Sequence, residues 1–174
     1  MFMSHVQSFP PIANPNAHIL ILGSMPGKES LRAVQYYAHR RNAFWPIMGE
    51  LVGAAATLPY DVRTRMLKSA GIALWDVLAS CTRLSSLDTD IEADSICAND
   101  FVTFFLKHPN ITQVFFNGTM AEKYFHKHVL PLLEPRLEHR PRHYRRLPST
   151  SPANASMLFE QKLRAWKVIL RGNP

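Results

Sequence analysis

The stretch Ile19-Leu20-Ile21-Leu22-Gly23-Ser24-Met25-Pro26-Gly27-Lys28 decides the fold class. Its first four residues are aliphatic, and a Gly/Pro turn follows them directly. A short apolar run between turn residues is typical of a strand that is buried on both faces. Similar runs, the last of them weaker, occupy residues 71–75, 111–116 and 143–147. We therefore predict four strands.

Segments with the apolar spacing of helices separate and follow these strands. They lie at residues 44–51, 62–67, 101–106, 121–133 and 158–170. In the last segment Lys162 belongs to the basic edges beside an apolar stripe, and we expect Asn99 to cap the helix near Phe101. The alternation predicts an α/β fold, a three-layer α/β/α sandwich around a central, mostly parallel four-stranded sheet.

Length and composition narrow the class of protein. The chain has 174 residues, 47% of them apolar, which favours a single domain over residues 1–174. Residues 1–16 contain three prolines and are expected to form an extended N-terminal arm. Residues 1–11 lack the apolar core of a signal peptide, and no apolar run approaches the ~20 residues of a membrane span. We expect a soluble, cytoplasmic protein.

The charge and the cysteines indicate the kind of partner and cofactor. Lys and Arg number 20 against 13 Asp and Glu, a net charge of +7 that favours a polyanion, nucleic acid before a membrane surface. Two cysteines, Cys81 and Cys97, are too few for a four-thiolate site, and the eight histidines show no metal-ligand spacing. We expect no metal and no cofactor.

Polar and small residues follow all four predicted strands. They are the segment 23–28, Asp76, Asn117 with Gly118, and the segment 148–155. Because ligands of parallel sheets bind beyond the carboxyl ends of the strands, we predict the binding site at this edge.

The segment 23–28 is not a Walker A phosphate loop. That motif requires a Gly where Leu22 stands and a Ser or Thr where Glu29 stands. Two interpretations stay open. The turn brings its backbone close to a ligand, with Ser24 and Lys28 on phosphate, or it is an ordinary turn after a strand.

The segment 148–155 combines two prolines, three hydroxyls and an amide. An arginine run precedes it, consisting of Arg136, Arg140, Arg142, Arg145 and Arg146. The pattern suits contact with a sugar-phosphate backbone, and a solvated surface explains the arginines equally well.

Residues 36–45 gather aromatic, basic and amide side chains. Either Tyr36 or Tyr37 could stack on a nucleobase. The alternative is structural, with Phe44 in the core and Asn42 as the N-cap of the next helix.

Four motifs, in this order, resemble those of the uracil-DNA glycosylase superfamily, and most closely its hypoxanthine-DNA (deoxyinosine) glycosylase branch. They are Gly23-Ser24-Met25-Pro26-Gly27, Tyr37-Ala38-His39-Arg40-Arg41-Asn42-Ala43-Phe44-Trp45, Val114-Phe115-Phe116-Asn117-Gly118 and Ser149-Thr150-Ser151-Pro152-Ala153-Asn154-Ala155. The resemblance runs from about residue 19 to residue 155 and includes the stretches Trp75-Asp76-Val77-Leu78 and Ser86-Leu87-Asp88. The fold of that family agrees with the fold predicted above.

The resemblance implies a monofunctional DNA glycosylase of base excision repair. Such an enzyme flips a damaged base out of double-stranded DNA and hydrolyses its N-glycosidic bond without cutting the strand. Hypoxanthine is the expected base. No second copy is needed for this reaction, so we expect a monomer.

The resemblance also assigns roles to residues. Catalysis falls to Asn42, with Asp76 as the nearest carboxylate for a general base. Base binding falls to Gly23, Ser24, Met25, Tyr37 and Asn117, with Tyr37 as the stacking residue. Contact with the DNA backbone is expected from Lys28, Arg145, Arg146, Ser149, Ser151, Pro152 and Asn154.

The sequence departs from the wider superfamily at two positions. Met25 stands where many members carry the Asn or Asp that positions water, and Ser151 stands where uracil-specific members carry a His. A thioether cannot orient water, and the usual bulky wedge is absent. A uracil or G:T/U mismatch glycosylase and a non-catalytic DNA-binding module therefore stay open as alternatives. A nucleotide-binding enzyme is the weakest alternative.

Overall fold

The computed structural model describes residues 4–137, 141 and 143–171. The strands are β1 (Ser4–Gln7), β2 (Ile19–Gly23), β3 (Ile72–Asp76), β4 (Leu78–Arg83), β5 (Cys97–Ala98), β6 (Gln113–Asn117) and β7 (His143–Leu147). The four predicted strands are confirmed as β2, β3, β6 and β7, which form one parallel sheet in the order β3-β2-β6-β7. Parallel pairing places the carboxyl ends of all four strands at one edge.

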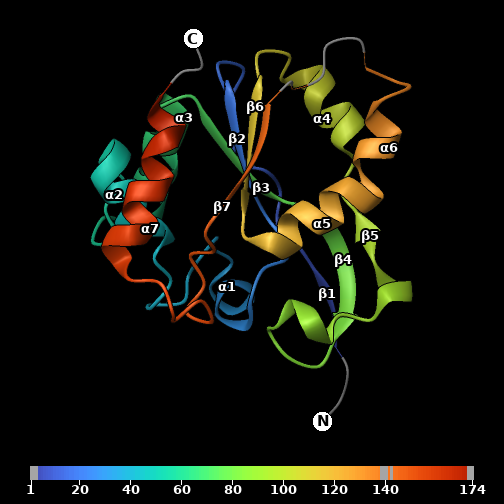
Figure 1. The fold of residues 1–174 in the computed structure, drawn as a ribbon, viewed down its shortest axis with the longest axis horizontal. Helices are drawn as coiled ribbons and strands as arrows, with labels where there is room; N and C mark the ends of the chain where they lie inside the picture. Colours follow the sequence, from blue (N-terminus) through green and yellow to red (C-terminus); the bar gives the residue numbers. More distant parts are fainter. Residues whose placement is uncertain (1–3, 138–140, 142, 172–174) are drawn as a thin grey trace.

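Helices cover both faces of this sheet. They are α1 (Lys28–Ala33), α2 (Phe44–Val52), α3 (Tyr60–Ser69), α4 (Phe101–Lys107), α5 (Thr119–His128), α6 (Leu130–Leu133) and α7 (Phe159–Trp166), with 3-10 turns η1 (Asp88–Asp90), η2 (Ala93–Ser95) and η3 (Lys167–Leu170). In Figure 1, α2, α3 and α7 lie on one side of the sheet and α4, α5 and α6 on the other. The predicted three-layer α/β/α architecture is confirmed.

The core forms where the sheet meets the two helical layers. Every residue of β2 and β3 is buried, as expected for strands with a helical layer on each face. On one side, aromatic side chains of α4 pack against Trp75 and Phe125. On the other side, Phe44 packs edge-on against Trp166 of α7. Each large apolar side chain buried in this way stabilises the fold by roughly 1.5–3 kcal/mol.

A second, antiparallel sheet has the order β1-β4-β5. The sequence did not predict it, because the alternation of buried and exposed residues in β4 is irregular. Strand β1 comes from the segment expected to be an extended arm, and Ile12 of that segment forms a bridge with Leu74. The described part of the segment therefore pairs with the body of the protein.

Two helix predictions need correction. The predicted segment 121–133 is divided at Val129 into α5 and α6, since Pro131 lacks the N–H that would continue the hydrogen-bond ladder of α5 and is accommodated in the first turn of α6. The N-cap of α4 is Asp100, whose Oδ1 accepts from the Thr103 backbone N–H at 3.0 Å. Asn99 instead donates from Nδ2 to the carbonyl of Asp76 at 2.8 Å.

None of the helices in the described residues is long and apolar enough to cross a membrane.

Candidate active site

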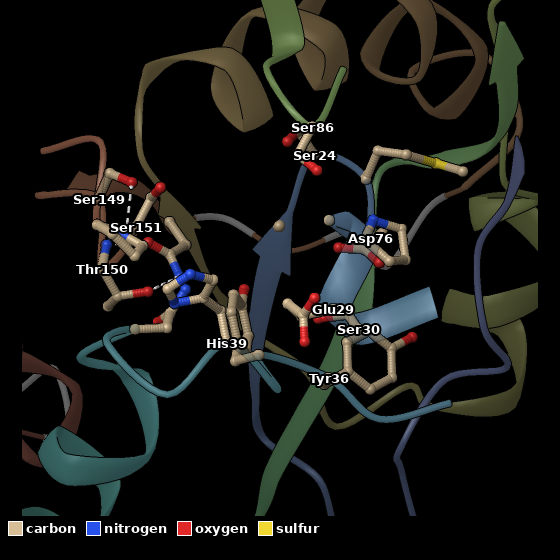
Figure 2. A pocket seen from close by; sticks show the side chains of 18 of the residues that line it. Ser24, Glu29, Ser30, Tyr36, His39, Asp76, Ser86, Ser149, Thr150 and Ser151 are labelled. Atoms are coloured by element: carbon tan, nitrogen blue, oxygen red, sulfur yellow. Dashed lines mark hydrogen bonds between the residues drawn. The ribbon is translucent and has the colours of Figure 1, made fainter. Parts of the chain in front are cut away.

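A pocket of about 230 Å³ opens at the carboxyl ends of the central strands. Figure 2 shows Asp76 and Tyr36 on one side of the pocket, and Ser149, Thr150 and Ser151 on the other. The residues predicted from sequence that line the pocket are Gly23, Ser24, Met25, Lys28, Tyr37, Asn42, Asp76, Asn117, Ser149, Ser151 and Pro152. The predicted residues Arg145, Arg146 and Asn154 do not line it.

Hydrogen bonds with residues of β4 and η1 hold the loop after β2 in place. The carbonyl of Ser24 accepts from the Leu78 N–H at 3.1 Å, and the Ser24 hydroxyl donates to Asp88 Oδ2 at 2.7 Å. The buried guanidinium of Arg83 donates to the carbonyl of Pro26. No described residue accepts a hydrogen bond from the N–H of Ser24 or Met25, so both donors are available to a ligand.

Tyr37 is fixed by stacking. Its ring lies 4.1 Å from the Phe44 ring, centroid to centroid, at an interplanar angle of 25°. Phe44 thus covers one face of Tyr37, and a stacking base must use the opposite face. The Tyr37 hydroxyl is buried without a hydrogen-bond partner in the described part of the chain. Burial, and secondly the charge of Asp76, raise the pKa of Tyr37 and outweigh the neighbouring Asn117 amide, which lowers it, so the phenol stays neutral.

Tyr36, the other stacking candidate, also lines the pocket but is only 3% exposed. Its hydroxyl donates to the carbonyl of Pro10 at 3.0 Å, and its ring packs edge-on against Phe9. Tyr37 is therefore the better placed of the two tyrosines to stack on a base.

Asn42 begins the turn into α2. Its Oδ1 accepts from the Phe44 backbone N–H at 2.9 Å, a local turn bond. The N-cap of α2 is Ala43, so the expectation that Asn42 is the N-cap is wrong. Its Nδ2 has no acceptor among the described residues, although the residue lines the pocket. The Asn42 side chain therefore uses its oxygen to hold the local turn, and its nitrogen can donate to a ligand.

Asp76 ends β3 and is 3% exposed. Its Oδ2 is buried and has no partner among the described residues. Burial, and then the nearby Asp88, raise the pKa of Asp76 to about 8, while Arg83 lowers it. A carboxyl with this pKa can hold its proton near neutral pH and donate a hydrogen bond, and the general-base role considered from sequence stays a prediction.

Asn117 binds the last loop. Its Oδ1 accepts from the Thr150 backbone N–H and its Nδ2 donates to the Thr150 hydroxyl, both at 2.9 Å. The carbonyl of Thr150 in turn accepts from the Ala43 N–H at 3.0 Å. The sequence indicated Thr150 only as part of a motif, whereas the structure shows it as the link between three of the four motifs.

The loop after β7 is held by α7. The Trp166 indole N–H donates to the carbonyl of Pro148 at 2.9 Å. The amide Nδ2 of Asn154 donates to the carbonyl of Ser149 at 3.0 Å, and Lys162 Nζ donates to the carbonyl of Asn154 at 2.9 Å. Lys162 is buried, which corrects its expected position at the basic edge of the helix. Asn154 therefore shapes this loop from outside the pocket.

The predicted arginine run does not gather at the pocket. Arg146 forms an ion pair with Glu122 of α5 at 3.1 Å, and Arg145 lines a separate surface hollow with His143 and Arg171. Arg140 and Arg142 lie outside the described residues. Contact of Arg145 and Arg146 with DNA stays a prediction.

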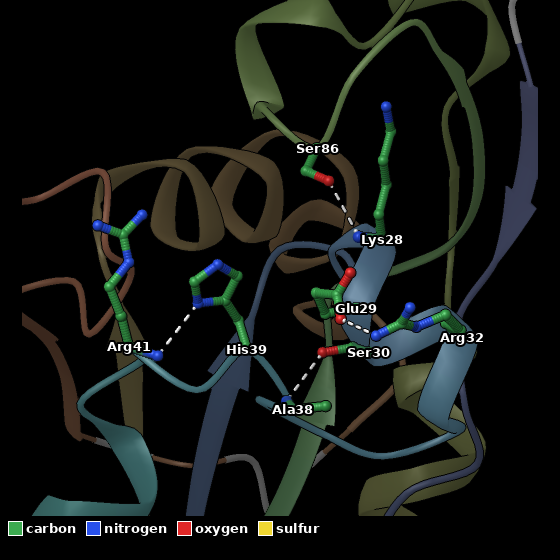
Figure 3. A network of polar contacts seen from close by, with 8 residues as sticks. All are labelled: Lys28, Glu29, Ser30, Arg32, Ala38, His39, Arg41 and Ser86. Atoms are coloured by element: carbon green, nitrogen blue, oxygen red, sulfur yellow. Dashed lines mark hydrogen bonds and ion pairs between the residues drawn. The ribbon is translucent and has the colours of Figure 1, made fainter.

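A polar network forms the rim near α1, and the sequence reasoning missed most of it. In Figure 3 the side chains of Lys28 and Arg41 extend to the same side, with His39 between them. His39 Nδ1 accepts from the Arg41 N–H at 3.1 Å, and the Ser86 hydroxyl accepts from the Lys28 N–H at 2.9 Å. The basic pair within the second motif was the sequence signal that could have indicated Arg41.

Comparisons with known proteins agree with this geometry. Residues 10–170 match the model of the uracil DNA glycosylase superfamily. A hypoxanthine DNA glycosylase of Methanosarcina barkeri is 40% identical over 119 residues, 68% of this chain and 74% of the relative. A protein of the same name from Methanosarcina acetivorans is 32% identical over 166 residues, 95% and 98% of the two chains.

A solved structure is also similar. It is the solution NMR structure of a Methanosarcina acetivorans protein described as a candidate uracil DNA glycosylase, with a TM-score of 0.74 and 30% identity over 97% of this chain and 100% of that chain. The parallel sheet, the pocket at its carboxyl edge and the family match lead to one conclusion: the chain belongs to the uracil DNA glycosylase superfamily.

Proposed function

We propose that this protein is a monofunctional DNA glycosylase that removes hypoxanthine from double-stranded DNA in base excision repair. The observation that carries the proposal is the unpaired Nδ2 of Asn42 at a pocket whose first loop presents Met25 instead of a water-binding amide or carboxylate. The relatives named hypoxanthine DNA glycosylase support the choice of base.

The pocket provides for binding of a flipped base. The base stacks on the face of the Tyr37 ring that Phe44 leaves open. Because Phe44 holds the Tyr37 ring in place, the Tyr37 ring fixes the plane of the base. The N–H groups of Ser24 and Met25 donate to acceptor atoms of the base edge. Asn117 keeps one amide hydrogen beyond the one it gives to Thr150, and we assign this hydrogen to the base as well.

The chemistry needs stabilisation of a leaving anion. When the bond between C1′ and N9 breaks, its electron pair moves to the purine, and the oxygen of a water molecule bonds to C1′. The Asn42 N–H donates to the purine as its charge grows, which lowers the barrier because the donor is already in place. The water proton passes to the base or to solvent. Asn42 itself donates a hydrogen bond and transfers no proton.

The DNA duplex is held by charge and by loop backbone. The net charge of +7 favours binding of a polyanion, and Lys28 lies at the pocket rim. We assign Ser149, Ser151 and Pro152 to the strand that carries the flipped nucleotide, since they line the opposite rim. A monomer suffices for this work, and we expect a cytoplasmic protein, associated with the nucleoid if the source is bacterial.

The test is a glycosylase assay on labelled duplexes that each contain one hypoxanthine, uracil, xanthine or G:T mispair. We expect strand breaks only after alkali and chiefly at hypoxanthine. Breaks before alkali would contradict the monofunctional mechanism. Breaks chiefly at uracil would keep the chemistry and change the base, an alternative favoured by the description of the structural neighbour. A folded, DNA-binding protein that cleaves no duplex would be a binding module.

A further inference from the structure

We propose that a basic hollow beside the C-terminal turn η3 binds the phosphate backbone of a second DNA segment, separate from the segment whose base enters the pocket. The inference goes beyond the proposed function, because it involves neither the damaged base nor the bond that is cleaved. A protein with both sites holds two DNA segments at once and can pass from one segment to the other without dissociating.

The basic hollow has a volume of about 330 Å³ and lies where the amino ends of β6 and β7 meet η3. Its lining includes Gln113, Phe115, His143, Arg145, Val168 and Arg171. The amide and the phenyl ring belong to buried residues, whereas the three basic side chains belong to exposed ones. The buried residues therefore form the floor and the basic residues form the rim. No acidic residue in the described part of the chain lines the hollow.

The register of the sheet explains why these side chains meet. Strands β6 and β7 are parallel, with Gln113 opposite His143 and Phe115 opposite Arg145. Paired residues of neighbouring strands point to the same face of a sheet, and the face alternates along each strand. Arg146 therefore points to the other face, where it forms an ion pair with an acidic residue of α5. That ion pair leaves Arg145 available on the face that carries the hollow.

The floor of the basic hollow contains a polar group that the fold does not satisfy. Gln113 is 8% exposed, and its side-chain amide has no hydrogen-bond partner among the described residues. A buried amide without a partner is unfavourable, because it has given up water and gained no hydrogen bond in return. Since Gln113 lines the hollow, its amide N–H groups are available to an acceptor that enters there.

The rim of the basic hollow carries two guanidinium groups that are also available. Neither Arg145 nor Arg171 forms an ion pair within the described residues. Arginine binds phosphate through pairs of charge-assisted hydrogen bonds, and glutamine amides also donate to phosphate oxygens. This set of donors, with no acid beside it, matches the backbone of DNA. The net charge of +7 favours the same partner.

The basic hollow and the pocket lie toward opposite ends of the sheet. Gln113 begins β6 and lines the hollow, whereas Asn117 ends β6 and lines the pocket, so the two are roughly 13 Å apart along the strand. In Figure 1 the red C-terminal turn and the beginning of β7 lie at the end of the sheet away from α1. Duplex DNA is stiff, so a duplex seated on the pocket rim does not curve around α7 to enter the hollow. We therefore assign the hollow to a second segment.

The experiment counts the DNA molecules in the complex. A lesion-free duplex, too short to hold two proteins side by side, is added in excess to the full chain at low salt. Native mass spectrometry then measures the mass of each complex. We expect complexes of one protein with two duplexes, which disappear as salt is added. Complexes that stop at one duplex per protein at every DNA concentration would overturn the proposal.

Two variants test the two kinds of contact. Arg171→Ala removes a charge from the rim, and Gln113→Leu removes the floor amide without a change in charge. Because that amide has no described partner, Gln113→Leu should unfold in urea at the same denaturant concentration as wild type or a higher one. We expect each variant to bind the second duplex about 10-fold more weakly and the first duplex as wild type does. Unchanged binding of the second duplex by both variants would overturn the proposal.

Arg65→Ala is the matched control for charge. It removes the same charge as Arg171→Ala, but Arg65 pairs with Asp61 on α3 and lines neither the pocket nor the basic hollow. Its second duplex should bind as in wild type. Equal weakening of the second duplex in Arg65→Ala and Arg171→Ala would overturn the site, because net charge alone would then explain the effect.

The lesion-free duplex separates this inference from the proposed function. If the protein excises no base and complexes with two duplexes still form through the basic hollow, only the proposed enzyme function fails. If an active enzyme binds a single duplex, only the second site fails. Complexes of two proteins with two duplexes that persist in Arg171→Ala and Gln113→Leu would also overturn the inference, because contact between proteins would then hold the duplexes together.

Discussion

The two sides of the pocket differ in how their polar groups are satisfied. On the paired side, formed by Asn117, Ser149 and Thr150, the Asn117 amide binds Thr150, and the Ser149 carbonyl accepts from Asn154, which lies outside the pocket. On the open side, formed by Ser24, Met25, Tyr37, Asn42 and Asp76, a backbone N–H pair, a phenol, an amide nitrogen and a carboxyl oxygen have no partner among the described residues.

This difference indicates which residues hold the loops of the site in place and which residues bind the ligand. Buried polar groups in folded proteins are nearly always hydrogen-bonded, so the buried, unpaired Tyr37 hydroxyl and Asp76 Oδ2 indicate where a ligand or water binds. A fully paired network instead holds its loop in one conformation. The paired side is thus expected to affect mainly stability when mutated, and the open side mainly turnover.

The largest effect is expected from Asn42→Ala. Loss of a donor to a developing anion lowers a rate by about 10²–10³-fold, so single-turnover excision of hypoxanthine should fall by that factor. Asn42→Asp is the matched control, since it keeps the oxygen that accepts from the Phe44 N–H and lacks the Nδ2 donor. It should be equally inactive and more stable than Asn42→Ala in urea unfolding. A fully active Asn42→Ala would reject the catalytic assignment.

Gly23→Ala should follow, with a loss of about 10- to 100-fold in excision. The added Cβ would displace the Asp76 carboxyl and the Tyr37 hydroxyl, which removes hydrogen bonds to the base. Gly27→Ala is the control, because the nearest atoms to its Cβ are those of Ser86 at 3.9 Å. Equal rates for the two variants would show that the crowded end of the pocket does not contact the base.

On the paired side, Thr150→Val should lower stability rather than the rate of the folded enzyme. The Asn117 Nδ2 loses its hydroxyl acceptor in a buried site, at a cost of about 1–3 kcal/mol in the free energy of unfolding. Thr150→Ser keeps the hydroxyl and should lose less. A Thr150→Val protein of normal stability and strongly reduced rate would place Thr150 on the open side instead.

The smallest effects are expected from the DNA contacts. Lys28→Ala and Arg145→Ala should each weaken binding of any duplex and reduce the slope of log affinity against log salt by about 1. Fluorescence anisotropy at several salt concentrations measures this slope. Lys28 lines the pocket, whereas Arg145 lines a separate hollow. An unchanged slope in Arg145→Ala would indicate that Arg145 does not contact DNA and that the arginine run is a solvated surface.

The sequence alone predicted the layers and the edge of the sheet that carries the site. Apolar runs such as residues 19–22 can be recognised from neighbouring residues alone. Because every residue of the run is apolar, it is expected to be buried on both faces of the sheet. The small sheet β1-β4-β5 was not predicted, because the paired residues of β1 and β4 are 73 to 79 positions apart in sequence and their pairing has no local signal.

Within the site, the sequence indicated which residues gather, and the tertiary structure decided what each one can do. Asn42, Tyr37 and Asn117 follow from motifs. That Asn117 binds Thr150 through both ends of its amide, that Asn42 keeps only its nitrogen free, and that burial raises the pKa of Asp76 depend on neighbours distant in the chain. The physical reason is that hydrogen-bond partners and pKa values are set by burial and by nearby charges, which exist only once the chain has folded.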